Sequence, residues 1–369
     1  MKNFIFISPH FPTNYENFIM ELRANGVNVY GIGDTAYDNL TDNLRGALTE
    51  YYRVDNMEDD DQMYKAVAYL CFKHGHMDGL ESNNEYWLEQ DAALRTDFNI
   101  PGMKTEDMEH VKYKSKMKKY YEAIGVPVAR YHMVTDFEAS KAFIDEVGYP
   151  VIVKPDNGVG ASTTYKLKSD DDLWNFHCTD FHGVQFIMEE FVPCEIYSYD
   201  GIFDSNGDPL LETGNHTPIS IMDSVNNQDN SIFYIEKRIA DDLREIGRKT
   251  VKSFGVKSRF VHFEFFRLTE DHAYLGPKGT IIGLEVNLRP SGGFTPEMYN
   301  YANSTNVYKD WADMVCFDRL TVPDYPEKYF CVSAGLRFSK PYIHSVDEVM
   351  ARYGRNIMMA TQLDPALAT

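Results

Sequence analysis

The first hundred residues alternate between short apolar runs and amphipathic segments. Asn3–Ile7 and Val27–Tyr30 are apolar runs typical of buried strands, whereas Tyr15–Asn25 and Asp61–Lys73 have helical periodicity and are each followed within two residues by a glycine. A further helix is expected over Asn84–Phe98. Strands that alternate with helices predict a small parallel α/β domain.

A glycine-containing stretch follows the second strand. Its sequence, Gly31-Ile-Gly33-Asp-Thr-Ala36, faintly echoes a dinucleotide-binding fingerprint. That fingerprint follows the first strand of its unit and opens a helix. Neither condition is met here, so cofactor binding at these glycines is a minor alternative.

A lysine-rich segment lies beyond the expected domain boundary at Pro101–Asp107. His110–Gly125 carries five lysines and is predicted to be one helix. Spacing of three and four residues places four side chains on one helix face, namely Lys114, Met117, Lys118 and Tyr121. This face is either a solvated lysine face or a surface from which a lysine points at a phosphate.

A β-branched run, Val151–Pro155, carries Lys154 and leads into a loop of small residues. Asn157-Gly158 is a hairpin signal by itself, and a strand returns at Tyr165–Lys168. Small residues also let backbone amides approach an anion closely. On this segment alone a plain hairpin is favoured over a phosphate-binding loop.

The most informative stretch is Ile281–Gly293, IIGLEVNLRPSGG. Strand alternation sends Leu284, Val286 and Leu288 to one face, and Glu285, Asn287 and Arg289 to the other. Carboxylate and amide oxygens suit a hard cation such as Mg²⁺, and a guanidinium suits an anion held by that metal. The alternative is an exposed polar strand face with a surface ion pair.

A second strand supports the metal-binding interpretation. Phe260–Leu268 places His262 and Glu264 on one face, opposite an apolar face. If this strand pairs with Ile281–Leu288, two glutamates face the same space. Like charges placed there destabilise the pair unless a cation is shared. A third strand, Phe186–Met188, runs into Glu189-Glu190-Phe191-Val192-Pro193, a pattern typical of a sheet edge or an inter-domain hinge.

Composition narrows the classes of function. The chain has 369 residues, of which 43 % are hydrophobic and 25 % charged, as in globular proteins of two or three domains. Its net charge of −20 argues against nucleic acid and anionic membrane surfaces as partners. The five cysteines form no CxxC pair, which favours reduced thiols in a cytoplasmic protein. No apolar run suits a signal peptide or a membrane span.

Six elements follow one another over Lys114–Gly293: a helix lysine, a strand lysine, a small-residue loop, Glu-Glu-Phe-Val, a strand glutamate and Glu-x-Asn-x-Arg. This order resembles the ATP-grasp superfamily and, within it, the carboxylate–amine ligases. The resemblance implies an α/β (α+β grasp) fold. A small parallel-sheet pre-ATP-grasp domain is expected at residues 1–103, an N-terminal ATP-grasp subdomain at 104–190, and a C-terminal subdomain with the metal site at 191–369. Ile357–Ala360 is a candidate closing strand.

The resemblance also implies a nucleotide site. Lys114 and Lys154 would hold the α- and β-phosphates of ATP. The loop over the β- and γ-phosphates would contain Gly158, Gly160, Ala161 and Ser162. The hinge whose backbone meets adenine would be Glu189, Glu190, Phe191 and Val192, and Glu195 would accept the ribose hydroxyls.

The metal and substrate residues are implied in the same way. Glu264, Glu285 and Asn287 would bind two Mg²⁺ ions, for which Mn²⁺ is an alternative. Arg289 would clamp the carboxylate and acyl phosphate together with Ser291, Gly292 and Gly293. Arg289 and Lys154 are the expected catalytic residues.

The function that this resemblance implies is ATP-dependent joining of a small-molecule carboxylate to an amine. An acyl phosphate would be the intermediate, and ADP and phosphate would be released. Two alternatives stay open: an ATP- or ADP-binding regulatory or scaffold protein without turnover, and a kinase-like activity without an amine acceptor. A homodimer is compatible with the resemblance, and the residues identify neither substrate.

Overall fold

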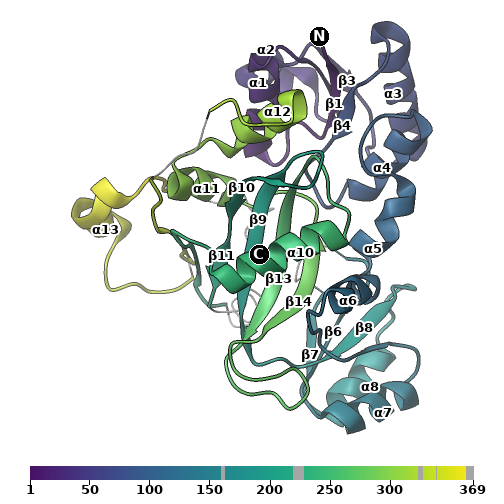
Figure 1. Cartoon of the computed structure of the whole chain (residues 1–369), viewed down its shortest axis with the longest axis vertical. Coiled ribbons are helices and arrows are strands. Elements are labelled where there is room, and N and C mark those ends of the chain that lie inside the picture. The colour runs from purple at the N-terminus through teal and green to yellow at the C-terminus, as the bar shows by residue number, and fades with distance from the viewer. Residues whose placement is uncertain (159–162, 219–227, 323–326, 338, 363–369) are drawn as a thin grey trace.

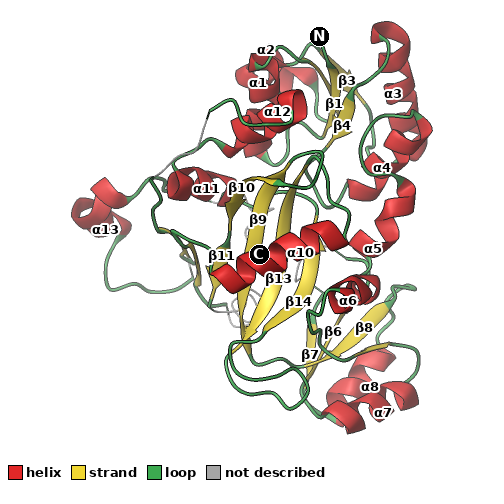
Figure 2. Ribbon diagram, viewed as in Figure 1, coloured by secondary structure: helices red, strands yellow, loops and turns green. Residues whose placement is uncertain are grey.

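The computed structural model describes residues 1–158, 163–218, 228–322, 327–337 and 339–362. The strands in these residues form three sheets (Figures 1 and 2). A four-stranded sheet lies in the N-terminal region, a second four-stranded sheet contains β5 to β8, and a seven-stranded sheet is built from later strands.

The N-terminal sheet is parallel, with strand order β3-β2-β1-β4. Its strands are β1 (Asn3–Ile7), β2 (Asn28–Gly33), β3 (Glu50–Arg53) and β4 (Gly79–Glu81), and its helices are α1 (Glu16–Ala24), α2 (Asp42–Ala47), α3 (Asp60–His74) and α4 (Leu88–Asp97). Phe4 and Phe6 pack into one apolar cluster, and Ile5 and Ile7 into another. Both faces of β1 are therefore buried, as expected for a parallel sheet covered by helices.

Two local expectations change in this region. Helix α4 begins at Leu88 rather than at Asn84, because Asn83 has a positive φ of 54° and the chain turns before the helix starts. Gly31 and Gly33 lie inside β2, where Tyr51 packs against them. A Cβ added to Gly33 would lie 2.7 Å from the Tyr51 hydroxyl, so close packing accounts for this glycine.

The second sheet has the order β5-β8-β6-β7 and is antiparallel. Its strands are β5 (Tyr131–Met133), β6 (Val151–Pro155), β7 (Tyr165–Leu167) and β8 (Phe186–Glu190), and α7 (Phe137–Val147) and α8 (Asp170–Cys178) pack on it. The pairing of β6 with β7 confirms the predicted hairpin. Of the two alternatives for Glu189-Glu190, the sheet edge is wrong, because β8 lies between β5 and β6, whereas the inter-domain hinge stays a prediction.

The large sheet has the order β14-β13-β9-β11-β12-β15, with β10 also paired to β9. Its strands are β9 (Cys194–Phe203), β10 (Pro209–Thr213), β11 (Asn215–Thr217), β12 (Ser231–Ile235), β13 (Arg259–Leu268), β14 (Ile281–Asn287) and β15 (Cys331–Gly335). Helix α10 (Asp241–Ser253) crosses one face of this sheet (Figure 2). Gly247 allows this approach, since a Cβ there would lie 2.3 Å from the Tyr199 ring.

The predicted helix His110–Gly125 is two helices, α5 (Met108–Lys112) and α6 (Lys114–Ala123), with 3₁₀ turn η3 (Thr105–Asp107) before them. The break at Tyr113 has a long-range cause. The Lys114 amide donates to the Asp156 carbonyl at 3.0 Å. The Ser115 amide and hydroxyl both donate to the Asp156 carboxylate at 2.7 Å. Asp156 thus satisfies the first amides of α6, and Lys114 stands at the start of the new helix.

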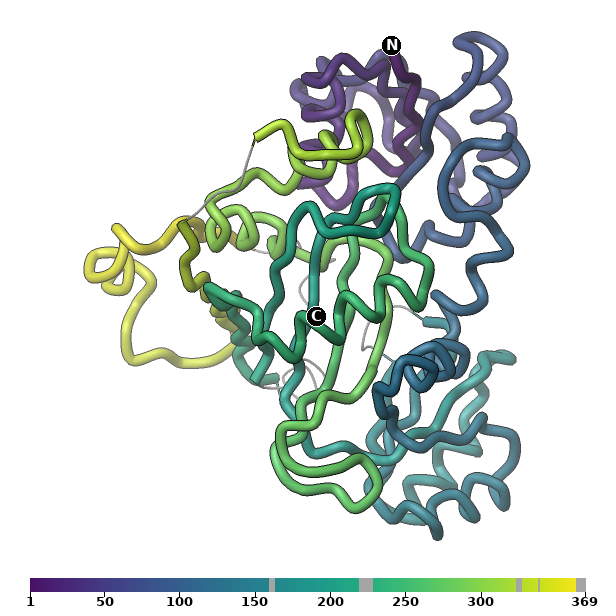
Figure 3. Tube along the Cα trace, viewed as in Figure 1, coloured from purple at the N-terminus to yellow at the C-terminus, as the bar shows by residue number. Residues whose placement is uncertain are grey.

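After β14 the chain returns to the N-terminal region. Helices α11 (Thr295–Asn303) and α12 (Val307–Phe317) follow β14, and α12 lies beside α1 (Figure 3). Trp311 packs edge-on against Phe4, Phe6 and Phe18. The segment behind β14 is therefore fixed between the first sheet and the large one.

The last described elements are α13 (Val346–Tyr353) and 3₁₀ turn η4 (Gly354–Asn356). Ile357–Ala360 has no strand conformation, so the expectation of a closing strand there is wrong; the residues make no ladder pairing that could hold them extended. The remaining short 3₁₀ elements are η1 (Thr13–Tyr15) and η2 (Tyr37–Asn39). Among the described residues, no helix combines the length and apolarity needed to cross a membrane.

Candidate active site

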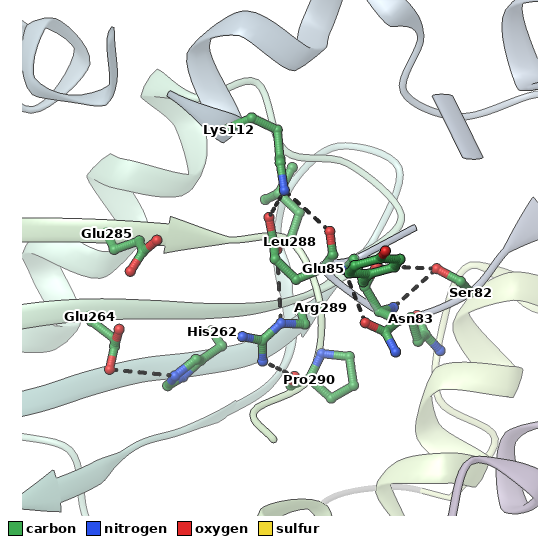
Figure 4. Close-up of polar contacts among 12 residues, drawn as sticks. Ser82, Asn83, Glu85, Lys112, His262, Glu264, Glu285, Leu288, Arg289 and Pro290 are labelled. Atoms are coloured by element: carbon green, nitrogen blue, oxygen red, sulfur yellow. Dashed lines mark hydrogen bonds and ion pairs between the residues drawn. The ribbon is translucent and has the colours of Figure 1, made fainter. Parts of the chain in front are cut away.

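Strands β13 and β14 bring the predicted metal ligands together. In their antiparallel register Glu264 lies directly opposite Glu285, and His262 lies opposite Asn287. Val261, Phe263 and Phe265 point to the other face of β13 and are fully buried. Figure 4 shows both glutamate side chains extending from the two neighbouring strands into the same space. The adjacent carboxylates expected from strand alternation are present.

The two carboxylates differ in their electrostatic surroundings. Burial raises the pKa of Glu264, and the neighbouring Glu285 raises it further against the opposing effect of His262. Burial also acts to raise the pKa of Glu285, but Lys114 and Lys154 outweigh it and lower that pKa. Glu285 is thus the carboxylate that keeps its negative charge most firmly.

Lys114, at the start of α6, reaches this pair. Its Nζ lies 3.1 Å from Glu285 Oε1 and donates to the Gly158 carbonyl at 3.0 Å. The side chain is 8 % exposed, so the alternative of a solvated lysine face does not hold for Lys114. Gly158 is the last described residue before the small-residue loop. The predicted loop residues Gly160, Ala161 and Ser162 lie outside the described residues.

Glu189 holds two lysines by its side chain. Its Oε2 lies 2.7 Å from Lys154 Nζ, and its Oε1 lies 2.6 Å from Lys118 Nζ. All three side chains are buried. Lys118 was not among the predicted site residues. Its four-residue spacing from Lys114 on an otherwise apolar helix face is the signal that would have found it.

The other predicted hinge residues lie around β8 and its end. Glu190 points away from Glu189 because strand side chains alternate, and it pairs with Arg130 at 2.7 Å. The Phe191 ring lies 4.0 Å from Lys166 Nζ, and Val192 is buried in a small apolar cluster with Ile282. Glu190 therefore has a structural partner within its own sheet.

Because of Glu189, the free energy of unfolding of the chain should depend on pH. Burial raises its pKa, but Lys118 and Lys154 outweigh burial and hold the pKa at about 2 instead of 4.5. This lowered pKa contributes stability above pH 4.5 that is lost as the pH falls toward 2. We expect the free energy of unfolding to fall by on the order of 2–3 kcal/mol from this group over that range. Denaturant unfolding at several pH values should show a shallower fall for Glu189→Gln, and an unchanged slope would contradict this assignment.

Glu195, on β9, lies in a different setting from the buried acids. Its carboxylate is 40 % exposed, and Oε2 lies 2.9 Å from His216 Nε2. The His216 ring stacks on Tyr197 with centroids 4.0 Å apart, and its Nδ1 lies 2.5 Å from the Tyr234 hydroxyl. A ribose hydroxyl that approached Glu195 would meet an acid already oriented by this histidine.

Arg289 lies just beyond β14, where the N-terminal region contacts the large sheet. Its Nε is 3.8 Å from Glu85 Oε2, and its Nη1 donates to the Pro290 carbonyl at 2.9 Å. Lys112 Nζ holds the other Glu85 oxygen at 2.9 Å (Figure 4). Among the described residues, Asn83 Nδ2 and Glu85 Oε2 are buried without a hydrogen-bond partner.

Neither Asn83 nor Glu85 was predicted as a site residue, because Glu85 was assigned to the first turn of the helix expected over Asn84–Phe98, whereas the helix begins only at Leu88. The other predicted clamp residues surround Arg289. Ser291 is buried, Gly292 is exposed, and the Gly293 carbonyl accepts from Asn14 Nδ2 at 3.1 Å. Arg289 thus stands between the glutamate pair and a polar wall contributed by the first hundred residues.

His262 was singled out in the sequence only as part of a polar face. In the structure its Nδ1 lies 2.5 Å from the fully buried Asp200 Oδ1, and its Nε2 lies 3.8 Å from Glu264. Asp200 therefore fixes the ring next to the glutamate pair. Burial lowers the pKa of His262, but Asp200 and Glu264 outweigh it and raise that pKa.

The oxygen atoms that the chain offers at this site suit a metal ion whose remaining ligands come from a bound molecule. Glu264, Glu285 and Asn287 offer two carboxylates and an amide, whereas Mg²⁺ prefers six oxygens. Among the described residues, no group of three or more acid, histidine or cysteine side chains could hold a metal by itself. The set fits Mg²⁺ when phosphate oxygens complete the coordination.

The sequence has relatives among curated proteins, although no family model matches the chain. The L-arginine-specific L-amino acid ligase of Bacillus subtilis is 22 % identical over 275 residues, which cover 70 % of this chain and 64 % of that protein. The alanine–anticapsin ligase of Bacillus subtilis is 22 % identical over 236 residues, covering 56 % of this chain and 49 % of that protein. The chain thus spans between half and two thirds of these relatives.

Solved structures share the fold. An L-amino acid ligase from Bacillus licheniformis matches with a TM-score of 0.66 at 16 % identity, covering 85 % of this chain and 74 % of that one. The biotin carboxylase domain of 2-oxoglutarate carboxylase from Hydrogenobacter thermophilus matches with a TM-score of 0.69 at 15 % identity, covering 90 % and 73 %. The chain is thus similar in sequence to these ligases and shares its fold with these solved structures, in agreement with the resemblance to the ATP-grasp superfamily that the order of its motifs carries.

Proposed function

We propose that this chain is an ATP-dependent carboxylate–amine ligase that forms an amide or peptide bond through an acyl phosphate and releases ADP and phosphate. The observation that carries the proposal is the meeting of Lys114 with the Glu264–Glu285 pair. Lys154 and Arg289 both act to lower the pKa of Glu285 in this pair. Cations and metal-binding acids side by side match the needs of phosphoryl transfer.

The relatives support this proposal. The two curated relatives are ligases, and the Hydrogenobacter thermophilus domain was crystallised with MgADP, ADP and bicarbonate. We therefore assign ATP and Mg²⁺, with two ions and Mn²⁺ as a substitute, to this site. The same domain forms a dimer in its crystal structure, and a homodimer of the present chain stays a prediction.

In the proposed mechanism the chain aligns the reacting groups and neutralises their charge, and it forms no covalent bond to the substrate. Lys114 and Lys154 would hold the nucleotide phosphates, and Glu264, Glu285 and Asn287 would hold Mg²⁺, which would supply positive charge to the transferred phosphoryl group. Arg289 binds the substrate carboxylate and then the acyl phosphate. An amine displaces phosphate from that carbonyl carbon and loses a proton, which gives the amide.

The polar side chains of Asn83 and Glu85, on the wall beside Arg289, limit which substrates fit the site. Asn83 Nδ2, a donor, and Glu85 Oε2, an acceptor, are buried without a hydrogen-bond partner, although Arg289 Nε lies 3.8 Å from Glu85 Oε2. A buried polar group without a partner is costly, so a ligand with polar groups of its own suits this wall. We infer that the carboxylate substrate is small and carries a further polar group.

Release of ADP and phosphate from Mg-ATP, measured with a panel of amino acids and dipeptides, tests the proposal. We expect turnover that requires both a carboxylate and an amine, with one amide formed per ADP. ADP release that needs the carboxylate but that no amine stimulates, with no amide formed, would instead indicate the kinase-like activity. ATP binding without ADP release under every pairing would contradict the ligase and favour a regulatory protein.

A further inference from the structure

Two residues with different proposed partners are paired with each other in this structure. Lys114, assigned to a nucleotide phosphate, lies 3.1 Å from Glu285, assigned to a metal ion. Their side chains are 8 % and 23 % exposed, so little water screens the pair. A cation that approached Glu285 would meet the ammonium group of Lys114 at the same carboxylate.

The charged groups around Glu285 also disfavour binding of a divalent cation in the absence of a nucleotide. Besides Lys114, which forms the ion pair, Lys154 and Arg289 also act to lower the pKa of Glu285 against the effect of its burial. The described residues hold no group of three acid, histidine or cysteine ligands for a metal. A divalent ion alone would therefore find few ligands and much positive charge, whereas an anionic nucleotide would draw the lysines to itself.

We propose that Lys114 couples metal binding to nucleotide binding by exchanging partners. Without nucleotide its ammonium group neutralises Glu285 and excludes divalent cations; with nucleotide it moves to a phosphate and frees Glu285 for the metal. This inference rests on the proposed function and deepens it, because the ligand of the site becomes the metal–nucleotide complex. Free metal followed by nucleotide is then the disfavoured order.

The exchange predicts a result that is not expected if Lys114 only binds a phosphate. Because Lys114 would compete with the metal for Glu285 but contact a phosphate of the nucleotide, its loss should affect the two ligands in opposite directions. Nucleotide-free protein should bind a divalent cation more tightly, and the protein should bind ADP more weakly. A lysine that only contacts phosphate would weaken ADP binding and leave metal binding without nucleotide unchanged.

The experiment titrates the protein with Mn²⁺, follows free Mn²⁺ by electron paramagnetic resonance with and without saturating ADP, and measures ADP affinity separately by calorimetry. Wild type should bind Mn²⁺ about tenfold or more tightly with ADP present. Lys114→Met should gain about fivefold or more in Mn²⁺ affinity without ADP and lose most of the coupling. Lys116→Met is the matched control on the same helix, since Lys116 is 45 % exposed and pairs with Glu109 at 2.9 Å.

Two further variants secure the test. Lys114→Gln serves as a second neutral variant, with folding of each checked by circular dichroism. The double variant Lys114→Met/Glu285→Gln should lose the gain in Mn²⁺ affinity, which places the extra binding at Glu285 rather than elsewhere on an acidic surface. An unchanged or weaker affinity of folded Lys114→Met and Lys114→Gln for Mn²⁺ would overturn the exchange, and ADP binding by wild type in the same experiment would leave the proposed function, which turnover tests, uncontradicted. Wild type that binds no ADP would overturn the proposed function itself.

Discussion

Replacing Glu285 by glutamine is expected to lower amine-dependent ADP release by about 100- to 1,000-fold while the chain stays folded. Glutamine keeps the size of the side chain but removes the negative charge that pairs with Lys114 and would bind metal. It also removes the like charge opposite Glu264, so the sheet itself loses a repulsion. Steady-state ADP release with the best carboxylate and amine pair, together with circular dichroism, measures both effects.

A matched control separates this site from general charge effects. Glu109→Gln removes the same charge from an exposed residue whose partner is Lys116, at 2.9 Å. Its turnover should equal that of wild type. Turnover of Glu285→Gln within threefold of wild type would remove Glu285 from the reaction and contradict the metal site of the proposed function.

The Glu264–Glu285 pair is the part of the site that local sequence determines most directly. Each glutamate lies on the polar side of a strand whose other side is apolar, and period-two alternation fixes both orientations. Register alone remained open. The structure places the two opposite each other, with a register shift directly after Glu264. A strand pattern thus predicts which way a carboxylate points, and pairing decides what it meets.

Other parts of the site depend on contacts that no local pattern contains. The break before Lys114 is imposed by Asp156, which lies 41 residues from Ser115 in the chain. Glu85 reaches Arg289 only because the N-terminal region packs against the large sheet. The spacing of Lys118 from Lys114 places it on the predicted helix face, but its ion pair with Glu189 depends on the packing of α6 against β8. Long-range packing, not propensity, sets these positions.

Replacing Arg259 by methionine is expected to lower the free energy of unfolding by about 3–5 kcal/mol, although Arg259 is not assigned to any ligand. Arg259 is buried at the start of β13 and pairs with Glu81 of β4, with Nη1 2.8 Å from Oε2 and Nη2 3.0 Å from Oε1. Methionine fills similar space but leaves the Glu81 carboxylate buried with Arg95, 3.4 Å away, as its cationic neighbour. Denaturant unfolding followed by circular dichroism measures the loss.

Arg267→Met on the same strand is the matched control, because Arg267 pairs at 2.8 Å with an Asp242 that is 54 % exposed. It should cost no more than about 1 kcal/mol. Equal losses in the two variants would show that the Glu81 pair does not hold the N-terminal sheet to β13.

Arg259 Nε also donates to the Leu288 carbonyl at 2.9 Å, directly before Arg289 in the chain. Arg259→Met should therefore raise the KM for the carboxylate more than it lowers kcat, because the clamp loses its support while the phosphate lysines keep theirs.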